Sequence, residues 1–312
     1  MSRVSDVLRG SKAAVREVLY NLHPFATVPG PFLDAPMPEA LRQYQAHDEP
    51  NLDRIAWQLV TSSQMEVPLY ERWCALMHER PVLRRKIWEW VYILEVLKQH
   101  GMLAAGKRGL GFGCGTEPLT ALMASLGCEI LATDLDEERA RKQGWTKSHE
   151  HARGLAQLNE RQICDAELFA RKVTYRSCDM NAIPDDLRDF DFVWSSCSLE
   201  HLGSLGKGLD FIERSLECLR PGGVAVHTTE FNLGSNAKTL ETTATVAYRK
   251  KDIEGLASSL IGKGYRIPRI NFSPGNQTLD RVVDRPPYSH SIHLKLLYRR
   301  HLLTSIGLFV VK

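Results

Sequence analysis

The chain has 312 residues, of which 43% are hydrophobic and 25% charged, and its formal net charge is +3. No apolar run approaches the roughly eighteen residues that cross a membrane, the N-terminal sequence lacks the apolar stretch of a secretory signal, and so small a charge does not by itself indicate nucleic-acid binding. Seven scattered cysteines, an odd number, indicate reduced thiols, so the composition predicts a globular protein of the cytoplasm.

Two segments precede the region of regular pattern. Residues 1–50 hold a patch rich in proline and glycine and are predicted to form an irregular N-terminal arm. Residues 51–106 are predicted to form a helical cap that stops near Gly101. Its apolar positions recur at helical spacing, at Ile87, Trp90, Val91, Leu94 and Leu97.

Strand and helix patterns alternate from residue 107 onward, which is typical of an α/β domain with a parallel sheet. The strands are predicted at 108–113, 129–134, 173–178, 190–196 and 224–231, with a sixth near 265–272 and a last one at 304–311. Helices are predicted at 118–126, 137–144, 209–219 and 252–261. The domain spans residues 107–312 in this interpretation, with insertions at 145–172, 232–251 and 273–301.

A glycine-rich turn follows the first of these strands. Gly113 and Gly115 let the backbone turn tightly and approach a ligand closely, and Pro118 suits the first position of a helix whose N-terminus presents free N–H groups to polar ligand atoms. The next strand ends at Asp134, about twenty residues on, where a carboxylate can accept both hydroxyls of an adenosine ribose. Together these features predict a nucleoside cofactor.

Residues 107–312 resemble the class I methyltransferases that use S-adenosylmethionine (SAM). In that family the first loop reads acid-x-Gly-x-Gly-x-Gly, whereas the run here is GFGCGTE, with Gly111 in place of the acid and Glu117 in place of the last glycine. The turn at 219–223 before the fifth strand matches as well. The resemblance implies SAM as cofactor and a Rossmann-like α/β fold with a seven-stranded, mostly parallel sheet whose last strand is antiparallel.

The resemblance also implies which residues hold the cofactor. Asp179 follows the third strand, where the family places an acid that hydrogen-bonds adenine, and Ser196 ends the fourth strand near the methionine part of SAM. The family's acid, absent at Gly111, helps to hold the methionine ammonium, and we hypothesise that Glu117 takes over this role. The implied cofactor-binding residues are Gly111, Gly113, Cys114, Gly115, Glu117, Asp134, Leu135, Asp179, Met180 and Ser196.

Two residues are the candidates for catalysis. His201 follows the fourth strand and is the predicted general base for a hydroxyl acceptor, because imidazole titrates near neutral pH; the alternative is a structural histidine. Alternation along the fifth strand puts Glu230 on the face opposite His227, near the carboxyl edge of the sheet. Glu230 is predicted to accept hydrogen bonds from substrate hydroxyls or to act as the base, the alternative being a cap for loop N–H groups.

No metal site is predicted. Asp134 and Asp136 could share one side of their strand end, as carboxylate ligands of Mg²⁺ do, but Asp134 is already assigned to the ribose. Asp284, His290 and His293 lie in a proline-rich insertion, where exposed or hydrogen-bonded side chains are the more common outcome.

Charged and aromatic clusters in the cap receive plain structural interpretations. The basic clusters at 84–86 and 299–300 are predicted to be solvated charge, with contact to a phosphate-bearing acceptor as the alternative. Trp88 and Trp90 are predicted to pack in the core or against a lid rather than to stack on sugars.

The acceptor is inferred from a narrower resemblance. The runs GLGFGCGTEPL, TTEFNLGSN and PPYSHSIHLKLL resemble a bacterial methyltransferase subgroup associated with surface-polysaccharide and glycan gene clusters. It implies O-methylation of a saccharide or other small-molecule acceptor. The alternatives are a ribose methyltransferase acting on RNA and a SAM-binding protein without turnover; base methylation is not expected, because 195–198 reads SSCS instead of Asn/Asp-Pro-Pro-Tyr/Phe. The sequence leaves open whether the chain forms a homo-oligomer.

Overall fold

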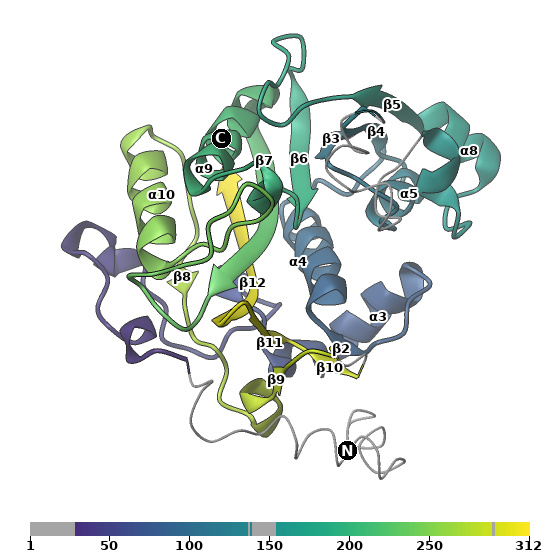
Figure 1. Ribbon diagram of the computed structural model, residues 1–312. Helices are drawn as coiled ribbons and strands as arrows, with labels where there is room; N and C mark the ends of the chain where they lie inside the picture. Colours follow the sequence, from purple (N-terminus) through teal and green to yellow (C-terminus); the bar gives the residue numbers. More distant parts are fainter. Residues whose placement is uncertain (1–28, 137, 139–153, 289–290) are drawn as a thin grey trace.

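The computed structural model describes residues 29–136, 138, 154–288 and 291–312, so that only residue 138 of the predicted helix at 137–144 is described. Its main sheet has ten strands, in the order β5-β4-β3-β6-β7-β12-β1-β8, with β11 and β9 attached through β12 (Figure 1). The strands are β1 (Trp57–Leu59), β2 (Leu83–Arg84), β3 (Arg108–Phe112), β4 (Glu129–Asp134), β5 (Val173–Ser177), β6 (Phe190–Ser196), β7 (Leu219–Asn232), β8 (Ile270–Asn271), β9 (Val283–Asp284), β10 (Ile292–His293), β11 (Lys295–Tyr298) and β12 (His301–Val311).

Six α-helices are described: α3 (Pro68–Leu76), α4 (Arg85–Gln99), α5 (Leu119–Ser125), α8 (Ala166–Lys172), α9 (Leu205–Ser215) and α10 (Lys250–Gly262). Short 3-10 helices include η1 (Pro31–Leu33), η2 (Glu39–Tyr44) and η5 (Leu199–His201). In Figure 1, α5 and α8 lie beside one end of the sheet and α10 beside the other. Among the described residues, no helix combines the length and the apolar character that a membrane crossing needs.

The centre of the sheet is parallel. β5, β4, β3, β6 and β7 pair in parallel, and β12 then runs antiparallel to β7, from Leu303 opposite Asn232 to Val311 opposite Val224. Every residue of β6 is buried, as expected of a parallel strand covered on both faces. These pairings confirm the predicted Rossmann-like α/β fold and its antiparallel last strand.

The sheet is wider than the seven strands predicted, because the N-terminal cap adds a strand to it. β1 lies between β12 and β8, with Gln58 opposite Gly307 in antiparallel register and Trp57 opposite Ile270 in parallel register. Trp57 is fully buried, and its indole Nε1 donates to the carbonyl oxygen of Phe309 at 2.6 Å. β9 and β11, from the last predicted insertion, extend the sheet further. The predicted helical cap is therefore helical only in part.

The described part of the predicted irregular arm, residues 29–50, packs against the domain. It forms the short helices η1 and η2, and its Leu33 and Leu41 are buried. The Nζ of Lys250 donates to the carbonyl oxygens of Phe32 at 3.0 Å and of Leu33 at 3.4 Å. A buried ammonium thus satisfies the carbonyls of this arm, which proline and glycine content alone could not indicate.

Different helices cover the two faces of the sheet. α4 packs on one face of β12, where a Cβ at Gly307 would overlap the ring of Tyr92. α9 covers the other face, where the ring of Phe211 lies 5.4 Å from that of His227. Glu230 faces α4, so the predicted alternation along this strand is confirmed. The first turn of α4 therefore meets the carboxyl ends of β6 and β7.

Candidate cofactor and acceptor site

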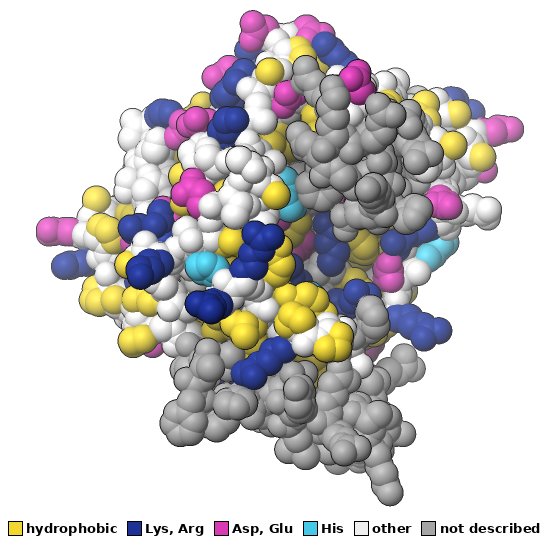
Figure 2. All heavy atoms as spheres, viewed as in Figure 1, with side chains coloured by type: hydrophobic (Ala, Val, Ile, Leu, Met, Phe, Trp, Pro, Cys, Tyr) yellow, Lys and Arg dark blue, Asp and Glu magenta, His cyan; other side chains and the backbone are white. Residues whose placement is uncertain are grey.

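A cavity of about 560 Å³ opens at the carboxyl ends of β3, β4, β6 and β7. The order of strands reverses at β3, with β4 and β5 on one side and β6 and β7 on the other, and open α/β sheets bind their ligands at such a point. Figure 2 shows a hollow on this face of the molecule, with Lys and Arg side chains inside it. The predicted site residues that line the cavity are Gly113, Gly115, Glu117, Asp134, Leu135, Asp179, Met180, Ser196, His201 and Glu230.

The glycine loop holds the carboxylate of Asp134 at the cavity wall. Its Oδ2 accepts from the backbone N–H of Gly115 at 3.1 Å and its Oδ1 from that of Leu135 at 2.8 Å. Gly113 and Gly115 have left-handed φ values of 60° and 51°, and a Cβ at Gly113 would lie 2.7 Å from Ser198 Oγ. Only glycine fits both the backbone conformation and the space here.

Two of the predicted cofactor residues do not line the cavity. Gly111 lies inside β3, and a Cβ there would overlap Cys114 Sγ and the indole ring of Trp194 on β6. Cys114 is 2% exposed, and burial raises the pKa of its thiol. Trp194 fills the space beside Gly111, and Cys114 packs in the core behind the loop, so neither position lines the cavity; their contact with the cofactor stays a prediction.

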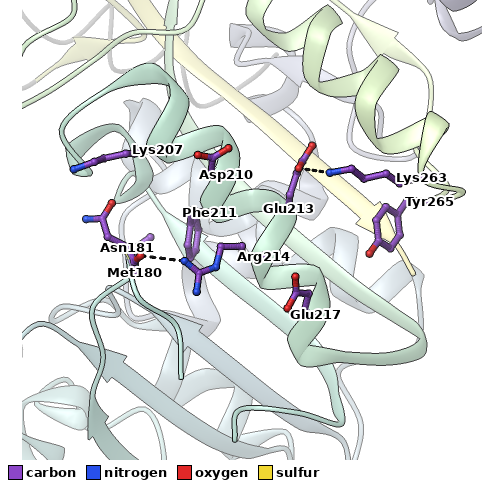
Figure 3. A pocket seen from close by; sticks show the side chains of 10 residues that line it. All are labelled: Met180, Asn181, Lys207, Asp210, Phe211, Glu213, Arg214, Glu217, Lys263 and Tyr265. Atoms are coloured by element: carbon purple, nitrogen blue, oxygen red, sulfur yellow. Dashed lines mark hydrogen bonds and ion pairs between the residues drawn. The ribbon is translucent and has the colours of Figure 1, made fainter. Parts of the chain in front are cut away.

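A short loop after β5 forms the end of the cavity where the resemblance to the family places adenine. Asp179 Oδ1 accepts from the backbone N–H of Asn181 at 2.9 Å, and Met180 is buried beside it. A second hollow, of about 420 Å³, lies behind this loop against α9. There Arg214 reaches from α9 and donates to the carbonyl oxygens of Asn181 at 3.1 Å and Ile183 at 3.5 Å (Figure 3). These two hydrogen bonds from Arg214 hold the loop that carries Asp179 against α9.

An ion pair spans the cavity between α4 and the glycine loop. Lys86 Nζ, from the first turn of α4, lies 2.5 Å from Glu117 Oε1 and donates to Ser196 Oγ at 3.2 Å. Burial raises the pKa of Glu117, and Lys86 partly opposes that rise. For Lys86, burial lowers the ammonium pKa, but Glu117 and Glu89 together with smaller contributions outweigh it, so the pKa is raised. Lys86 thus lines the cavity with its charge paired to Glu117, although two-fifths of its side chain stays exposed.

A family model described as a methyltransferase domain matches residues 88–254, more than half of the chain. The chain belongs to this methyltransferase family. The family uses SAM, and the loop geometry around Asp134 suits a nucleoside, so SAM is the cofactor of this methyltransferase.

Relatives of the methyltransferase share part of its length. Malonyl-[acyl-carrier protein] O-methyltransferase of Enterobacter lignolyticus is 30% identical over 122 residues, which are 39% of this chain and 38% of that protein. Two solved structures are each 14% identical in sequence to the present chain. The SAM-dependent methyltransferase from Mesorhizobium loti covers 70% of this chain and 96% of its own, with a TM-score of 0.44. Magnesium protoporphyrin IX methyltransferase from Synechocystis PCC 6803 with bound SAM covers 79% and 85%, with a TM-score of 0.43.

Beyond the residues that are predicted to hold the cofactor, the cavity of the methyltransferase continues toward β7. We call this region the acceptor half, and it is lined by Arg85, Cys197, Glu200, His201, Glu230 and His293. Both Nη atoms of Arg85 contact the carboxylate of Glu230, each at 2.5 Å. Burial lowers the pKa of Arg85, but Glu230 outweighs it and the guanidinium stays charged. A bidentate pair of this kind makes Glu230 a poor general base.

Three potential metal ligands meet in the acceptor half. Single ligand atoms of Cys197, Glu200 and Glu230 lie within 4.8 Å of one another. Glu200 is 1% exposed, its Oε2 accepts from Thr229 Oγ1 at 3.0 Å, and burial raises its pKa. Arg85 already binds both oxygens of Glu230, so a cation here would have to displace the guanidinium. We therefore read the cluster as a balanced charge network.

Two imidazoles line the acceptor half, and each has a fixed Nδ1. In His201 this atom contacts the carbonyl oxygen of Ala244 at 2.7 Å, and in His293 it contacts Asp284 Oδ2 at 2.5 Å. A third imidazole, His227, is fully buried away from the cavity, and burial lowers its pKa to about 3. His201 thus lies where a base was predicted, whereas His293 comes from an insertion interpreted as a loop. His290, named with it, lies outside the described residues.

Sequence reasoning missed the contribution of α4 to the site. Arg85, Lys86, Glu89 and Trp90 line the cavity from one side of this helix. A signal was available, because these three charged residues are the polar interruptions at helical spacing in an otherwise apolar run. Such interruptions mark a face that meets a polar cavity as well as one that meets water. Trp88, by contrast, is buried in the core as predicted.

Proposed function

We propose that this methyltransferase transfers the methyl group of SAM to a hydroxyl of a polyhydroxylated acceptor, a saccharide or glycolipid precursor. The observation that carries the proposal is the polarity of the acceptor half, which is lined by two carboxylates, a guanidinium and two imidazoles. Buried polar groups need hydrogen-bond partners. An acceptor with several hydroxyls can donate to the carboxylates and accept from the guanidinium, which an apolar acceptor cannot do.

A carboxylate acceptor is the second candidate, because the Enterobacter relative is named for a malonyl acceptor. Such an acceptor would share Arg85 with Glu230, whose carboxylate already contacts both Nη atoms, and would bring a second negative charge close to that of Glu230. A neutral hydroxyl acceptor adds no negative charge, and it can donate to the ionised carboxylate, which keeps lone pairs for further hydrogen bonds. The Arg85–Glu230 pair therefore favours the hydroxyl acceptor, and we propose that Glu230 accepts a hydrogen bond from it.

SAM supplies an activated methyl group on a sulfonium, so the work of the chain is mainly to hold and align the reactants. In our proposal Asp134 accepts the ribose hydroxyls and Asp179 the adenine amino group. The opposite charges of Lys86 and Glu117 match the two ends of the methionine zwitterion, with Glu117 holding the ammonium and Lys86 the carboxylate. Glu117 then fills the role of the acid missing at Gly111.

Replacing Lys86 by methionine is expected to weaken binding of S-adenosylhomocysteine (SAH) about tenfold, the size of one lost charge-assisted contact at a half-exposed site. Affinity for 5′-methylthioadenosine, which lacks both charged groups, should stay within twofold. Titration calorimetry with the two ligands measures the difference, and Lys207→Met, at an exposed lysine on α9, is the control. Equal losses for both ligands would show that Lys86 does not recognise the carboxylate.

The proposed acceptor is tested by incubating the purified chain with SAM and a panel of mono- and oligosaccharides. We expect SAH to bind in calorimetry and a product heavier by one CH₂ to appear in mass spectrometry. An RNA of mixed sequence is the rival substrate, and its binding should weaken steeply with salt if phosphates are contacted. Ribose methylation of that RNA, with no saccharide product, would overturn the proposal; SAH binding with no product from any substrate would indicate a cofactor-binding protein without turnover.

A further inference from the structure

The last insertion folds back over the acceptor half. Its strand β10 pairs with β2 in parallel, with His293 in register with Arg84 and Ile292 with Leu83. β2 runs directly into α4, so this pairing sets His293 beside the first turn of the helix that carries Arg85. An earlier strand of the same insertion, β9, ends in Asp284.

Asp284 is built to orient the imidazole of His293. The carboxylate is 1% exposed, the imidazole is one-fifth exposed, and Oδ2 lies 2.5 Å from Nδ1. A buried carboxylate that holds one nitrogen of an imidazole fixes the tautomer and stabilises the imidazolium that forms when the other nitrogen accepts a proton. His293 lines the cavity that also holds Glu230. Neither the cofactor nor the sheet needs a dyad at this place.

We propose that His293, oriented by Asp284, is the general base that removes the proton of the acceptor hydroxyl. This inference rests on the proposed function. The acceptor oxygen bonds to the methyl carbon as the carbon–sulfur bond breaks and its electron pair goes to sulfur, which leaves a neutral thioether. The acceptor proton passes to Nε2 of His293, while Nδ1 keeps its proton and donates to Asp284.

The surroundings keep His293 ready to accept a proton. Burial lowers the pKa of its imidazole, Asp284 opposes this, and Arg84 and Arg85 lower the pKa again. The ring of Tyr288 lies 5.8 Å from the imidazole of His293. The net shift is downward, so the ring is neutral at pH 7, and activity is present above the His293 pKa and is lost as the pH falls through it.

His201 is less suited to this task. Its Nδ1 contacts a backbone carbonyl, which fixes the tautomer, whereas the Nδ1 of His293 contacts a carboxylate. The base assigned from the sequence therefore gives way to a dyad whose two members lie nine residues apart in the insertion.

The test compares His293→Gln and Asp284→Asn with the wild-type chain, and His47→Gln, an exposed histidine on the arm, is the control. With a saccharide that serves as acceptor, we expect His293→Gln to lower kcat about 10²–10⁴-fold, the range of general-base catalysis, with SAH affinity within twofold. Asp284→Asn should lower kcat at least about tenfold and move the inflection of its pH profile downward, because the group that raises the His293 pKa is gone. Full kcat in His293→Gln would overturn the proposal, as would a larger loss in His201→Gln.

A second measurement does not need an acceptor. Diethyl pyrocarbonate acylates neutral imidazoles, and peptide mass spectrometry of the SAH-bound chain reports each histidine separately. We expect His293 to react in the wild type and several-fold more slowly in Asp284→Asn. If no saccharide is methylated while SAH binds and His293 reacts as described, the proposed acceptor fails and the dyad stands. An inert His293 would overturn the dyad whatever the acceptor is.

Discussion

Replacing Asp134 by alanine is expected to lower SAH affinity about 100-fold. In our proposal its carboxylate accepts hydrogen bonds from two hydroxyls of the ribose. Hydrogen bonds to a charged group contribute about 1.5–3 kcal/mol each, and two at the lower end of that range sum to about 3 kcal/mol, which corresponds to slightly more than 100-fold in affinity. Titration calorimetry with SAH measures the loss. Because 5′-methylthioadenosine keeps the ribose, it should lose affinity to the same degree, in contrast to its behaviour with Lys86→Met.

Two further variants separate this contact from damage to the loop. Asp134→Asn keeps one oxygen that can accept from a backbone N–H, so its loss in affinity should be smaller than that of the alanine variant. Asp185→Ala removes a carboxylate that is fully exposed on the surface and should bind SAH like the wild type. SAH binding within threefold of wild type in a folded Asp134→Ala would remove the ribose assignment.

Placing the family's acid back at position 111 is expected to damage the fold rather than improve binding. A Cβ at Gly111 would overlap Cys114 Sγ and the indole ring of Trp194, and the carboxylate would be buried without a partner among apolar groups. Overpacking costs about 1–3 kcal/mol and an unpaired buried charge adds to it, so Gly111→Asp should lower the free energy of unfolding by about 3 kcal/mol or more. Urea denaturation followed by circular dichroism measures this change.

The matched control is Gly255→Asp, at an exposed glycine of α10 where a Cβ meets nothing within 4 Å; its stability should change by less than about 0.5 kcal/mol. A double-mutant cycle with Trp194→Ala tests the cause, because removing the indole makes room and should reduce the cost of Gly111→Asp. If Gly111→Asp instead folds with wild-type stability and binds SAH more tightly, Trp194 does not exclude the acid.

The sequence was sufficient for the parallel centre of the sheet. The predicted bounds of 129–134 and 190–196 coincide with β4 and β6, because each has an apolar middle and ends in a polar residue at the sheet edge. β1 escaped prediction for the opposite reason. It has three residues, and its burial depends on β12, about 250 positions away, so no local pattern marks it as a strand.

The two halves of the site divide in the same way. Gly113, Gly115 and Asp134 belong to one continuous strand–loop–strand stretch, and local spacing was enough to bring them together. Arg85 comes before the cofactor loop in the sequence and His293 comes long after it, yet both line the cavity. A charged residue that precedes an apolar run gives the same sequence pattern in two cases, when its side chain is solvated by water and when it pairs with a buried carboxylate. Only the pairing of β2 with β10 decides between these outcomes.

The position of β1 has a consequence for fragments of this protein. A fragment beginning at residue 107 would contain every glycine and carboxylate of the cofactor loop, yet it would expose the edges of β12 and β8 and remove the indole that fills the space between them. Open strand edges of this kind invite pairing with other chains. The N-terminal cap is therefore no exchangeable module, and grafting it between relatives would require its three-residue strand to travel with the matching C-terminal partner.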